Sequence, residues 1–199
     1  MKKWIVSFLS TAYILFMAVL AFINYTNGDH KKALVAAGGI VCGAIPLILA
    51  LFIRLQFNVP LIIFYFLFLL GSQYFGSILG WYGLGWWDFF MHAVSGVLLA
   101  LAGIALYERF VHRRAGKEIS SWFVSLFILS FAVLGGVVWE VYEFSMDQFF
   151  GMTLQGGGNE DTMADLIADT LGGILIALPV IGRKPLNKPG SEENSDNTE

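Results

Sequence analysis

Six long apolar runs, separated by short polar segments, make up most of the chain. The runs cover about residues 4–23, 33–53, 59–79, 88–107, 121–143 and 161–181. An α-helix needs about 20 residues to cross about 30 Å of hydrocarbon, and every run is about that long. The pattern therefore predicts an all-α fold, a polytopic transmembrane bundle of six helices over residues 1–182. Residues 183–199, which end in GSEENSDNTE, have little apolar surface to bury and are expected to form a disordered tail.

The composition supports a membrane location. Hydrophobic residues make up 57% of the 199-residue chain and charged residues 14%, whereas charged residues are about a quarter of a soluble domain. Lys2 and Lys3 precede the first run, as they would in a secretory signal peptide. That run is longer than the apolar part of a signal peptide, and no small-residue cleavage motif follows Phe22, so we expect it to remain as the first helix. The single cysteine, Cys42, excludes a disulfide within the chain and a metal site built from cysteines.

The positions of lysine and arginine predict the orientation of the bundle, because basic residues in short connections resist translocation. Only Lys31 and Lys32 would lie outside if the N-terminus is cytoplasmic. The other ten basic residues would then be cytoplasmic: Lys2, Lys3, Arg54, Arg109, Arg113, Arg114, Lys117, Arg183, Lys184 and Lys188. This bias predicts that both termini, and therefore the tail, are cytoplasmic.

Three of the runs carry acidic residues at helical spacing. Two of them share the pattern D-x-x-x-[H/D]-x-x-x-G, which places its polar residues on one helix face. In the predicted orientation the fourth and sixth helices run inward and the fifth runs outward, so all these groups share the extracytoplasmic side. They are Asp88 and His92 before Gly96 in the fourth run, Glu140, Glu143 and Asp147 at the end of the fifth, and Asp161, Asp165 and Asp169 before Gly173 in the sixth.

Seven carboxylates and one imidazole, with no lysine or arginine among them, favour a metal site. An ionised carboxylate in hydrocarbon costs at least about 2.5 kcal/mol, and several carboxylates together repel one another, so they require protons or a cation. Oxygen ligands with one imidazole suit a divalent ion such as Mg²⁺, Mn²⁺ or Zn²⁺. His92 is also a candidate general acid or base. Handling of protons or monovalent cations and a purely structural polar network remain alternatives.

Some of these residues also have simpler explanations. Asp88 and Asp161 could serve only as helix caps or favour the positive end of a helix dipole. Asp147 could lie outside the membrane on an extended fifth helix. His92, Glu140, Asp165 and Asp169 are not explained by capping.

Small residues in three runs predict close helix packing. The G-x-x-x-G pair in the second run permits another helix to approach, and Pro46 can bend that run. Two glycine pairs flank the acidic groups and are expected to bring the fifth and sixth helices together. These residues are Gly39 and Gly43, Gly135 and Gly136, and Gly172 and Gly173.

Part of the chain resembles the VanZ-like superfamily of bacterial membrane proteins. The resemblance is carried by the segment DFFMH, the acidic end of the fifth run and the D-x-x-x-D-x-x-G that opens the sixth. The segments WEVYEF and DTMADLIADTLGG further resemble the YjdF-type inner-membrane family of that superfamily. In these families an Asp and a His open one helix, as Asp88 and His92 do. A Glu closes the next helix, where Glu140 or Glu143 stands. The resemblance covers about residues 86–178 and implies a multi-pass protein of the bacterial cytoplasmic membrane.

These observations lead to one functional prediction with two alternatives. We expect a metal-dependent enzyme acting on a lipid-linked phosphate at the outer leaflet, with no nucleic-acid partner. The alternatives are a transporter of divalent cations or protons, and a non-catalytic structural membrane protein. We also expect the two D-x-x-x-[H/D] helices to face each other across the fifth helix, with Asp165 and Asp169 within about 8 Å of His92 and of Glu140 or Glu143, near enough to share ions.

Overall fold

The structure, a computed structural model, describes residues 2–52, 59–111, 119–151, 153–156 and 158–181. Its described residues form helices and connections without a strand. The predicted tail, residues 183–199, lies outside the described residues. The all-α prediction is confirmed.

Six helical segments are long and apolar enough to cross a membrane, as the sequence predicts. The third becomes a π-helix half-way along, and a short 3₁₀ turn follows it. In chain order the elements are α1 (Lys2–Thr26), α2 (His30–Phe52), α3 (Val59–Leu69), η1 (Leu70–Ile78), η2 (Trp81–Leu84), α4 (Trp87–Phe110), α5 (Ser121–Phe150), α6 (Asn159–Ala177) and η4 (Leu178–Val180).

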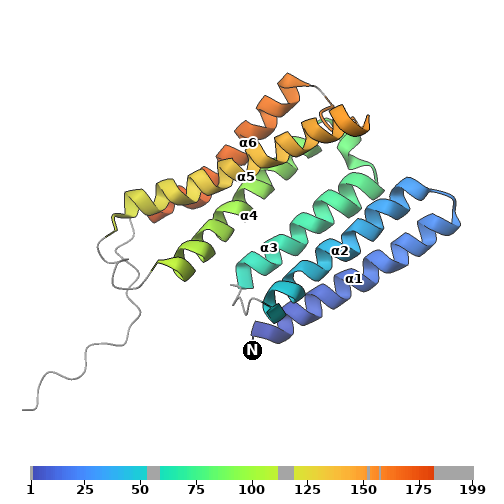
Figure 1. The fold of residues 1–199 in the computed structure, drawn as a ribbon, viewed down its shortest axis with the longest axis horizontal. Coiled ribbons are helices and arrows are strands. Elements are labelled where there is room, and N and C mark those ends of the chain that lie inside the picture. Colours follow the sequence, from blue (N-terminus) through green and yellow to red (C-terminus); the bar gives the residue numbers. More distant parts are fainter. Residues whose placement is uncertain (1, 53–58, 112–118, 152, 157, 182–199) are drawn as a thin grey trace, which may run out of the picture.

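The helices form two groups of three (Figure 1). One apolar core lies among α1, α2, α3 and η1, with Met17 and Ala36 fully buried. A second core of small residues lies among α4, α5 and α6 around Ala100 and Ala132. Only α3, η1 and η2 pack against α4 across the two groups, and among the described residues α5 and α6 stay more than 8 Å, between α-carbons, from α1, α2, α3, η1 and η2. The molecule is therefore two three-helix units joined along α4.

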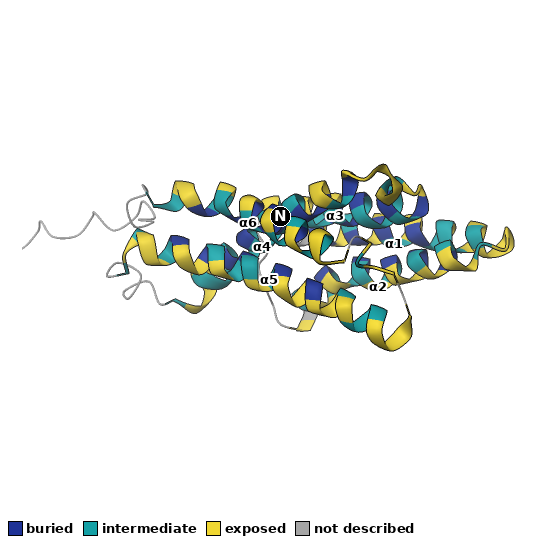
Figure 2. Cartoon of the chain, turned by 90° about the horizontal axis from the view of Figure 1, so that it is seen from above, coloured by how far each residue is buried: buried dark blue, intermediate teal, exposed yellow. Residues whose placement is uncertain are grey.

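The outward faces of both units are apolar. Figure 2 shows exposed positions running along the outer faces of the helices. Large hydrophobic side chains occupy many of them, for example Phe8, Val41, Leu134 and Leu175. A soluble protein would bury these side chains, whereas lipid tails solvate them without cost. The burial pattern therefore agrees with six helices surrounded by lipid.

Glycines bring α1 and α2 together. A Cβ at Gly43 would lie 2.8 Å from the Tyr13 ring, and a Cβ at Gly39 would meet the Met17 side chain. The predicted packing role of this G-x-x-x-G pair is confirmed. The Tyr13 hydroxyl donates to Gln73 Oε1 at 2.7 Å, which ties α1 to η1.

Glycines also allow α4 and α6 to touch directly. A Cβ at Gly96 would collide with the backbone carbonyl of Asp169, and a Cβ at Gly172 with the backbone carbonyl of Ala93. The expectation that α4 and α6 face each other across α5 is therefore wrong, because their backbones are in contact and α5 packs against both.

In the two pairs of adjacent glycines on α5 and α6, the two members of a pair contact different neighbouring helices. Gly136 meets the Asp169 side chain, whereas Gly135 meets Leu99 of α4. Gly173 meets α5 at Ala132. One member of each pair thus brings α5 and α6 together, as predicted, and the other packs on α4, because adjacent helical residues point about 100° apart.

Candidate metal centre

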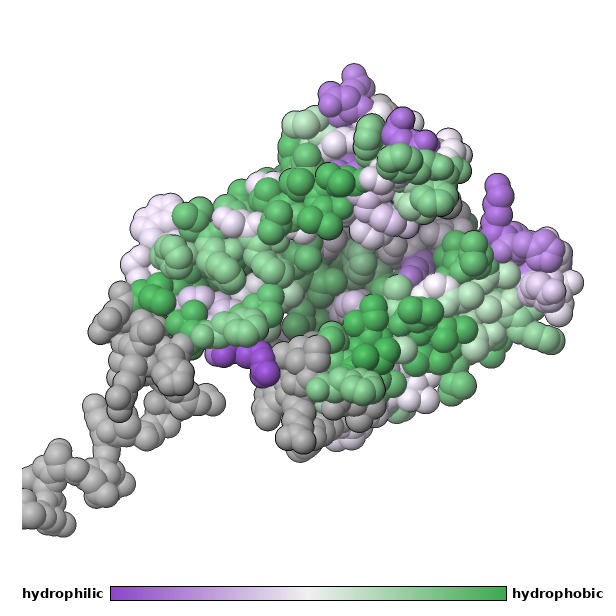
Figure 3. All heavy atoms as spheres, in the orientation of Figure 1, coloured by the Kyte–Doolittle hydropathy of each residue, from purple (hydrophilic) through white to green (hydrophobic). Residues whose placement is uncertain are grey.

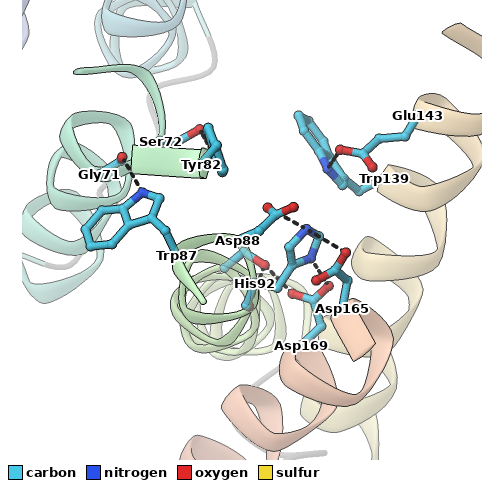
Figure 4. Close-up of polar contacts among 11 residues, drawn as sticks. Gly71, Ser72, Tyr82, Trp87, Asp88, His92, Trp139, Glu143, Asp165 and Asp169 are labelled. Carbon is cyan, nitrogen blue, oxygen red and sulfur yellow. Dashed lines mark hydrogen bonds and ion pairs between the residues drawn. The ribbon is translucent and has the colours of Figure 1, made fainter. Parts of the chain in front are cut away.

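His92 lies at the centre of a buried polar cluster between α4 and α6 (Figure 4). Its Nδ1 is 3.0 Å from Asp169 Oδ2. Its Nε2 is 3.8 Å from Asp88 Oδ1 and 3.8 Å from Asp165 Oδ2. The expected proximity of His92 to Asp165 and Asp169 is confirmed.

The cluster is withdrawn from its surroundings. Asp169 is 1% exposed, Asp165 2% and His92 6%, while Asp88 is intermediate. Asp88 lies in the first turn of α4, whose N-cap is Trp86, and no side chain caps that helix. The capping explanation for Asp88 is therefore not what the structure shows, since its carboxylate faces His92 instead.

Two oxygens and one nitrogen converge on a single point. Asp88, His92 and Asp165 each offer one ligand atom, and these three atoms lie within 4.8 Å of one another. Ligand bonds of about 2.0 to 2.2 Å at a tetrahedral angle place neighbouring ligand atoms about 3.3 to 3.6 Å apart. The two spacings of 3.8 Å at His92 Nε2 are slightly longer than this and too long for hydrogen bonds. These residues could therefore hold a metal ion after a small contraction.

Asp169 lies behind the imidazole. It contacts Nδ1, the nitrogen that faces away from Asp88 and Asp165, and its other oxygen accepts a hydrogen bond from Ser95. The Ser95 hydroxyl also lies 2.8 Å from the His92 carbonyl. A metal-bound histidine commonly donates its second N–H to a carboxylate in this way. The geometry therefore separates Asp169 from the three convergent groups.

Ser95 is a site residue that the sequence analysis missed. It follows Asp88 and His92 at i+7 and i+3, so the helical stripe could have included it. Serine is common in membrane helices and usually bonds to its own backbone, which makes its spacing a weak signal.

Glu140 is buried on α5 without a hydrogen-bond partner. It is 5% exposed, and neither of its carboxylate oxygens has a partner among the described residues. Gly136, one turn earlier on the same face, meets the Asp169 side chain. Because α5 and α6 run in opposite directions, Glu140 lies near the level of Asp165, whose Oδ2 also lacks a partner. Two buried carboxylates thus have free oxygens at the same depth.

The structure does not bring the other three predicted residues into this group. Glu143 accepts a hydrogen bond from Trp139 Nε1 at 2.9 Å. Asp147, on the extension of α5 beyond residue 143, accepts from the backbone N–H groups of Leu154 at 2.7 Å and Gln155 at 3.0 Å. Asp147 therefore orders the α5–α6 connection.

Asp161 is half-buried in the first turn of α6. The N-cap of that helix is Gly158, and no side chain caps it. A carboxylate in the first turn still interacts favourably with the helix dipole. The structure thus leaves Asp161 one turn above Asp165 on the same face.

No lysine or arginine balances the cluster within the described residues. Among the described residues, the ion pair that does not involve His92 joins Lys32 to Asp29, which lie outside the site. Tyr82 of η2 faces the same region (Figure 4). Burial raises the pKa of Tyr82 to about 12, a hydrogen bond with Ser72 opposes this shift, and the negative charge of Asp88 adds to it. Tyr82 therefore remains a neutral hydroxyl.

An ion held at this place would lie close to the membrane surface. Asp165 is six residues after the start of α6, about 9 Å along the helix axis. Trp81, Trp86 and Trp87 pack together where η2 leads into α4, and tryptophan is typical of the membrane–water interface. His92 and Asp165 are therefore shielded by protein and lie less than two turns from the starts of α4 and α6, while Asp88 lies in the first turn of α4.

Sequence comparison identifies the family of the chain. A family model described as a predicted membrane protein (DUF2238) matches residues 8–184. The chain belongs to this family. The match extends over both three-helix units, so the first three helices are part of the same family domain as the acidic cluster. No curated protein and no solved structure matches the chain.

Proposed function

We propose that this DUF2238 protein is a metal-dependent membrane enzyme. Its divalent cation is held by Asp88, His92 and Asp165, and its substrate is a lipid-linked phosphate at the outer leaflet of the bacterial cytoplasmic membrane. The observation that carries the proposal is the convergence of these three ligand atoms within 4.8 Å beside carboxylate oxygens without partners.

The arrangement around His92 supports this assignment. With Asp169 accepting a hydrogen bond from Nδ1–H, the lone pair of Nε2 points toward Asp88 and Asp165. A carboxylate behind a histidine fixes the ring orientation and raises its basicity as a ligand. An imidazole among carboxylates favours Mn²⁺ or Zn²⁺ over Mg²⁺, which prefers oxygen and water.

The balance of charge also favours a cation. Asp88, Asp165 and Glu140 together place three carboxylates in a region without a basic side chain, and leaving them ionised in a membrane would be costly. A divalent cation offsets two of these charges. Glu140, with both oxygens free, completes the ligand set or acts as the general base.

The ion would polarise a phosphoryl oxygen and activate water, which is the chemistry such a site supplies to phosphate esters. The residues around it would position the substrate. Both nitrogens of His92 would then be engaged, one by the metal and one by Asp169, so Glu140 becomes the better candidate for a general base.

The same structure argues against transport through the C-terminal unit. Below Asp169, toward η4, the interior is filled by the fully buried Ala100, Ala132 and Ile128. The Ser125 hydroxyl near that end donates to the Ala177 carbonyl at 2.8 Å. No chain of polar side chains leads from Asp169 to η4 in the described part of α4, α5 and α6.

The extracytoplasmic placement of the site and the kinship with the YjdF-type branch of the VanZ-like superfamily are part of the proposal. The excess of basic residues at the opposite helix ends supports the orientation. The D-x-x-x-H segment and the facing acidic helix support the kinship, because four of the residues that carry the resemblance lie together in the structure: Asp88, His92, Asp165 and Asp169.

Elemental analysis of the purified chain tests the proposal. We expect a stoichiometric divalent metal in the wild type and its loss in Asp165→Asn, because that change removes a ligand oxygen within the cluster. Glu160→Gln, an exposed position on the same helix, is the control and should keep the metal. Equal and negligible metal in all three proteins would refute the site.

Metal-dependent release of phosphate from a phosphorylated lipid then separates an enzyme from a structural metal site. An enzyme loses turnover when a chelator removes the metal and regains it when metal is returned. A protein with bound metal and no turnover on such lipids would support the structural alternative.

A further inference from the structure

One side of the cluster is not closed by a helix. On α4, Asp88 lies between Tyr82 of η2 and the Trp139–Glu143 pair of α5 (Figure 4). Within the described ranges, the α5 backbone does not come within 8 Å of α3, η1 or η2, measured between α-carbons. Figure 3 shows the surface hollowed between the two three-helix units. The Asp88 side chain is 35% exposed and the His92 side chain 7%, so the cluster is accessible from the Asp88 side.

A further carboxylate, Glu143, lies on the α5 side of Asp88 and is not among the three ligand groups of the His92 cluster (Figure 4). Glu143 accepts one hydrogen bond, from Trp139 Nε1 to its Oε1, and no described lysine or arginine pairs with it. The Trp139 ring that donates this bond packs against the Tyr142 ring, with the ring centroids 5.3 Å apart. A carboxylate with aromatic rings is an arrangement that binds ammonium groups by charge and by cation–π attraction.

The two groups lie at different depths. Glu143 is three residues beyond Glu140 on α5, about 4.5 Å farther toward the membrane surface. Glu140 lies near the level of Asp165, because Gly136 meets Asp169 one turn below. The order from the bilayer interior outward is therefore the metal ligands first and the Glu143 carboxylate second.

A phospholipid with an ammonium headgroup has the same order. Its acyl chains lie in the bilayer, its phosphate lies at the membrane interface, and its ammonium extends beyond the phosphate. We propose that the site binds a zwitterionic phospholipid of the ethanolamine type, which enters from the Asp88 side, between η2 and α5. Its phosphate lies at the cation and its ammonium at Glu143 and Trp139. The phosphate half of this inference rests on the proposed function, and the ammonium half rests on Glu143.

On the side of Asp88 opposite α5, the hydroxyl groups of Tyr82 and Ser72 supply a hydrogen-bond donor. Their hydroxyl oxygens are 2.9 Å apart, and either hydroxyl can donate to the other. Two hydroxyl groups carry two protons and the bond between them uses one, so one O–H is free to donate to a phosphate oxygen. The wall at η2 thus suits the anionic part of the headgroup, and the wall at α5 suits the cationic part.

Lipid retention by the purified full-length chain tests this inference. Detergent micelles would be doped with phosphatidylethanolamine, its N-acetylated derivative or phosphatidic acid, and the lipid that stays with the protein after gel filtration would be quantified. N-acetylation removes the ammonium charge and leaves the phosphate and the chains. We expect about fivefold to 30-fold more phosphatidylethanolamine than N-acetylated lipid on the wild type, since a cation–π contact shielded from water contributes about 1 to 2 kcal/mol.

The variant Glu143→Gln should remove this preference while keeping the metal, because Glu143 lies outside the ligand group. Glu160→Gln, an exposed carboxylate on α6, should keep both. Equal retention of the two lipids by the wild type, or an unchanged preference in Glu143→Gln, would overturn the inference. A Glu143-dependent preference in a protein without metal would refute the proposed function and leave the ammonium site standing.

Discussion

The contact between α4 and α6 makes a strong prediction about two glycines. In Gly96→Ala the new Cβ would collide with the backbone carbonyl of Asp169, and in Gly172→Ala with that of Ala93. A flexible side chain could rotate away, but a helix backbone cannot, so the two helices must move apart. Overfilling a packed interior costs about 1 to 3 kcal/mol. Replacing glycine by alanine inside a helix returns about 0.5 to 1 kcal/mol. We therefore expect each variant to lose about 1 to 2 kcal/mol of stability.

Gly38→Ala in α2 is the matched control. No atom lies within 4 Å of a Cβ built at Gly38, so this variant gains helix propensity without a clash. It should unfold at the same denaturant concentration as the wild type or a higher one. Helicity followed by circular dichroism during titration with SDS in mixed micelles would compare the three variants.

The same variants should also weaken metal binding. Separating α4 from α6 moves His92 and Asp88 away from Asp165, because these groups are on the two helices. If Gly96→Ala and Gly172→Ala unfolded at the same SDS concentration as Gly38→Ala, the direct backbone contact between α4 and α6 would be wrong. The geometry of the cluster, which depends on that contact, would then be wrong as well.

Two further predictions concern the site and the orientation. Asp169→Asn should lower metal affinity about 10-fold to 100-fold, as loss of a carboxylate behind a ligating histidine does. Thr170→Ala, at the next residue, is the control and should keep the affinity. Isothermal titration with Zn²⁺ measures both, and equal affinities would mean that Asp169 does not position His92. Reporter fusions ending after Arg114 and at the C-terminus should report cytoplasm, and one ending near Gly157 should report the exterior, because of the basic residues at the ends of the helices. The opposite result would place the site on the cytoplasmic side.

The helices could be predicted from the sequence because each apolar run has the length that hydrocarbon requires. The ends were less predictable. The fifth helix continues to Phe150 instead of ending near residue 143, because polar residues such as Asp147 can stay helical once they leave the hydrocarbon. The π-helix at Leu70–Ile78 had no sequence signal, and its contact with α4, in which Trp87 donates to the Gly71 carbonyl at 3.2 Å, is tertiary.

The site could be predicted as far as the helical stripes reach. The spacing of Asp88 with His92, and of Asp165 with Asp169, placed four groups on two facing stripes, and the structure brings these four together. Spacing could not tell which carboxylate faces which nitrogen of His92, because that depends on how the helices are rotated against each other. That Asp169 faces Nδ1 and Asp165 faces Nε2 of His92 follows from this rotation and therefore could not be predicted.

The glycines and the acidic residues of α4 and α6 are parts of one arrangement. Gly96 and Gly172 let the two backbones touch, and this contact removes Asp165 and Asp169 from both water and lipid. Burial in turn makes unpaired ionised carboxylates costly, so the close packing that glycine permits is also what makes a proton or a cation necessary. A helix pair held farther apart would admit water and could tolerate the same acids without an ion. In α4 the sequence pattern D-x-x-x-H-x-x-x-G therefore has a physical basis, because its glycine, Gly96, allows the backbone contact that buries the acids. In α6 that contact is made by Gly172, one residue before the glycine of the pattern.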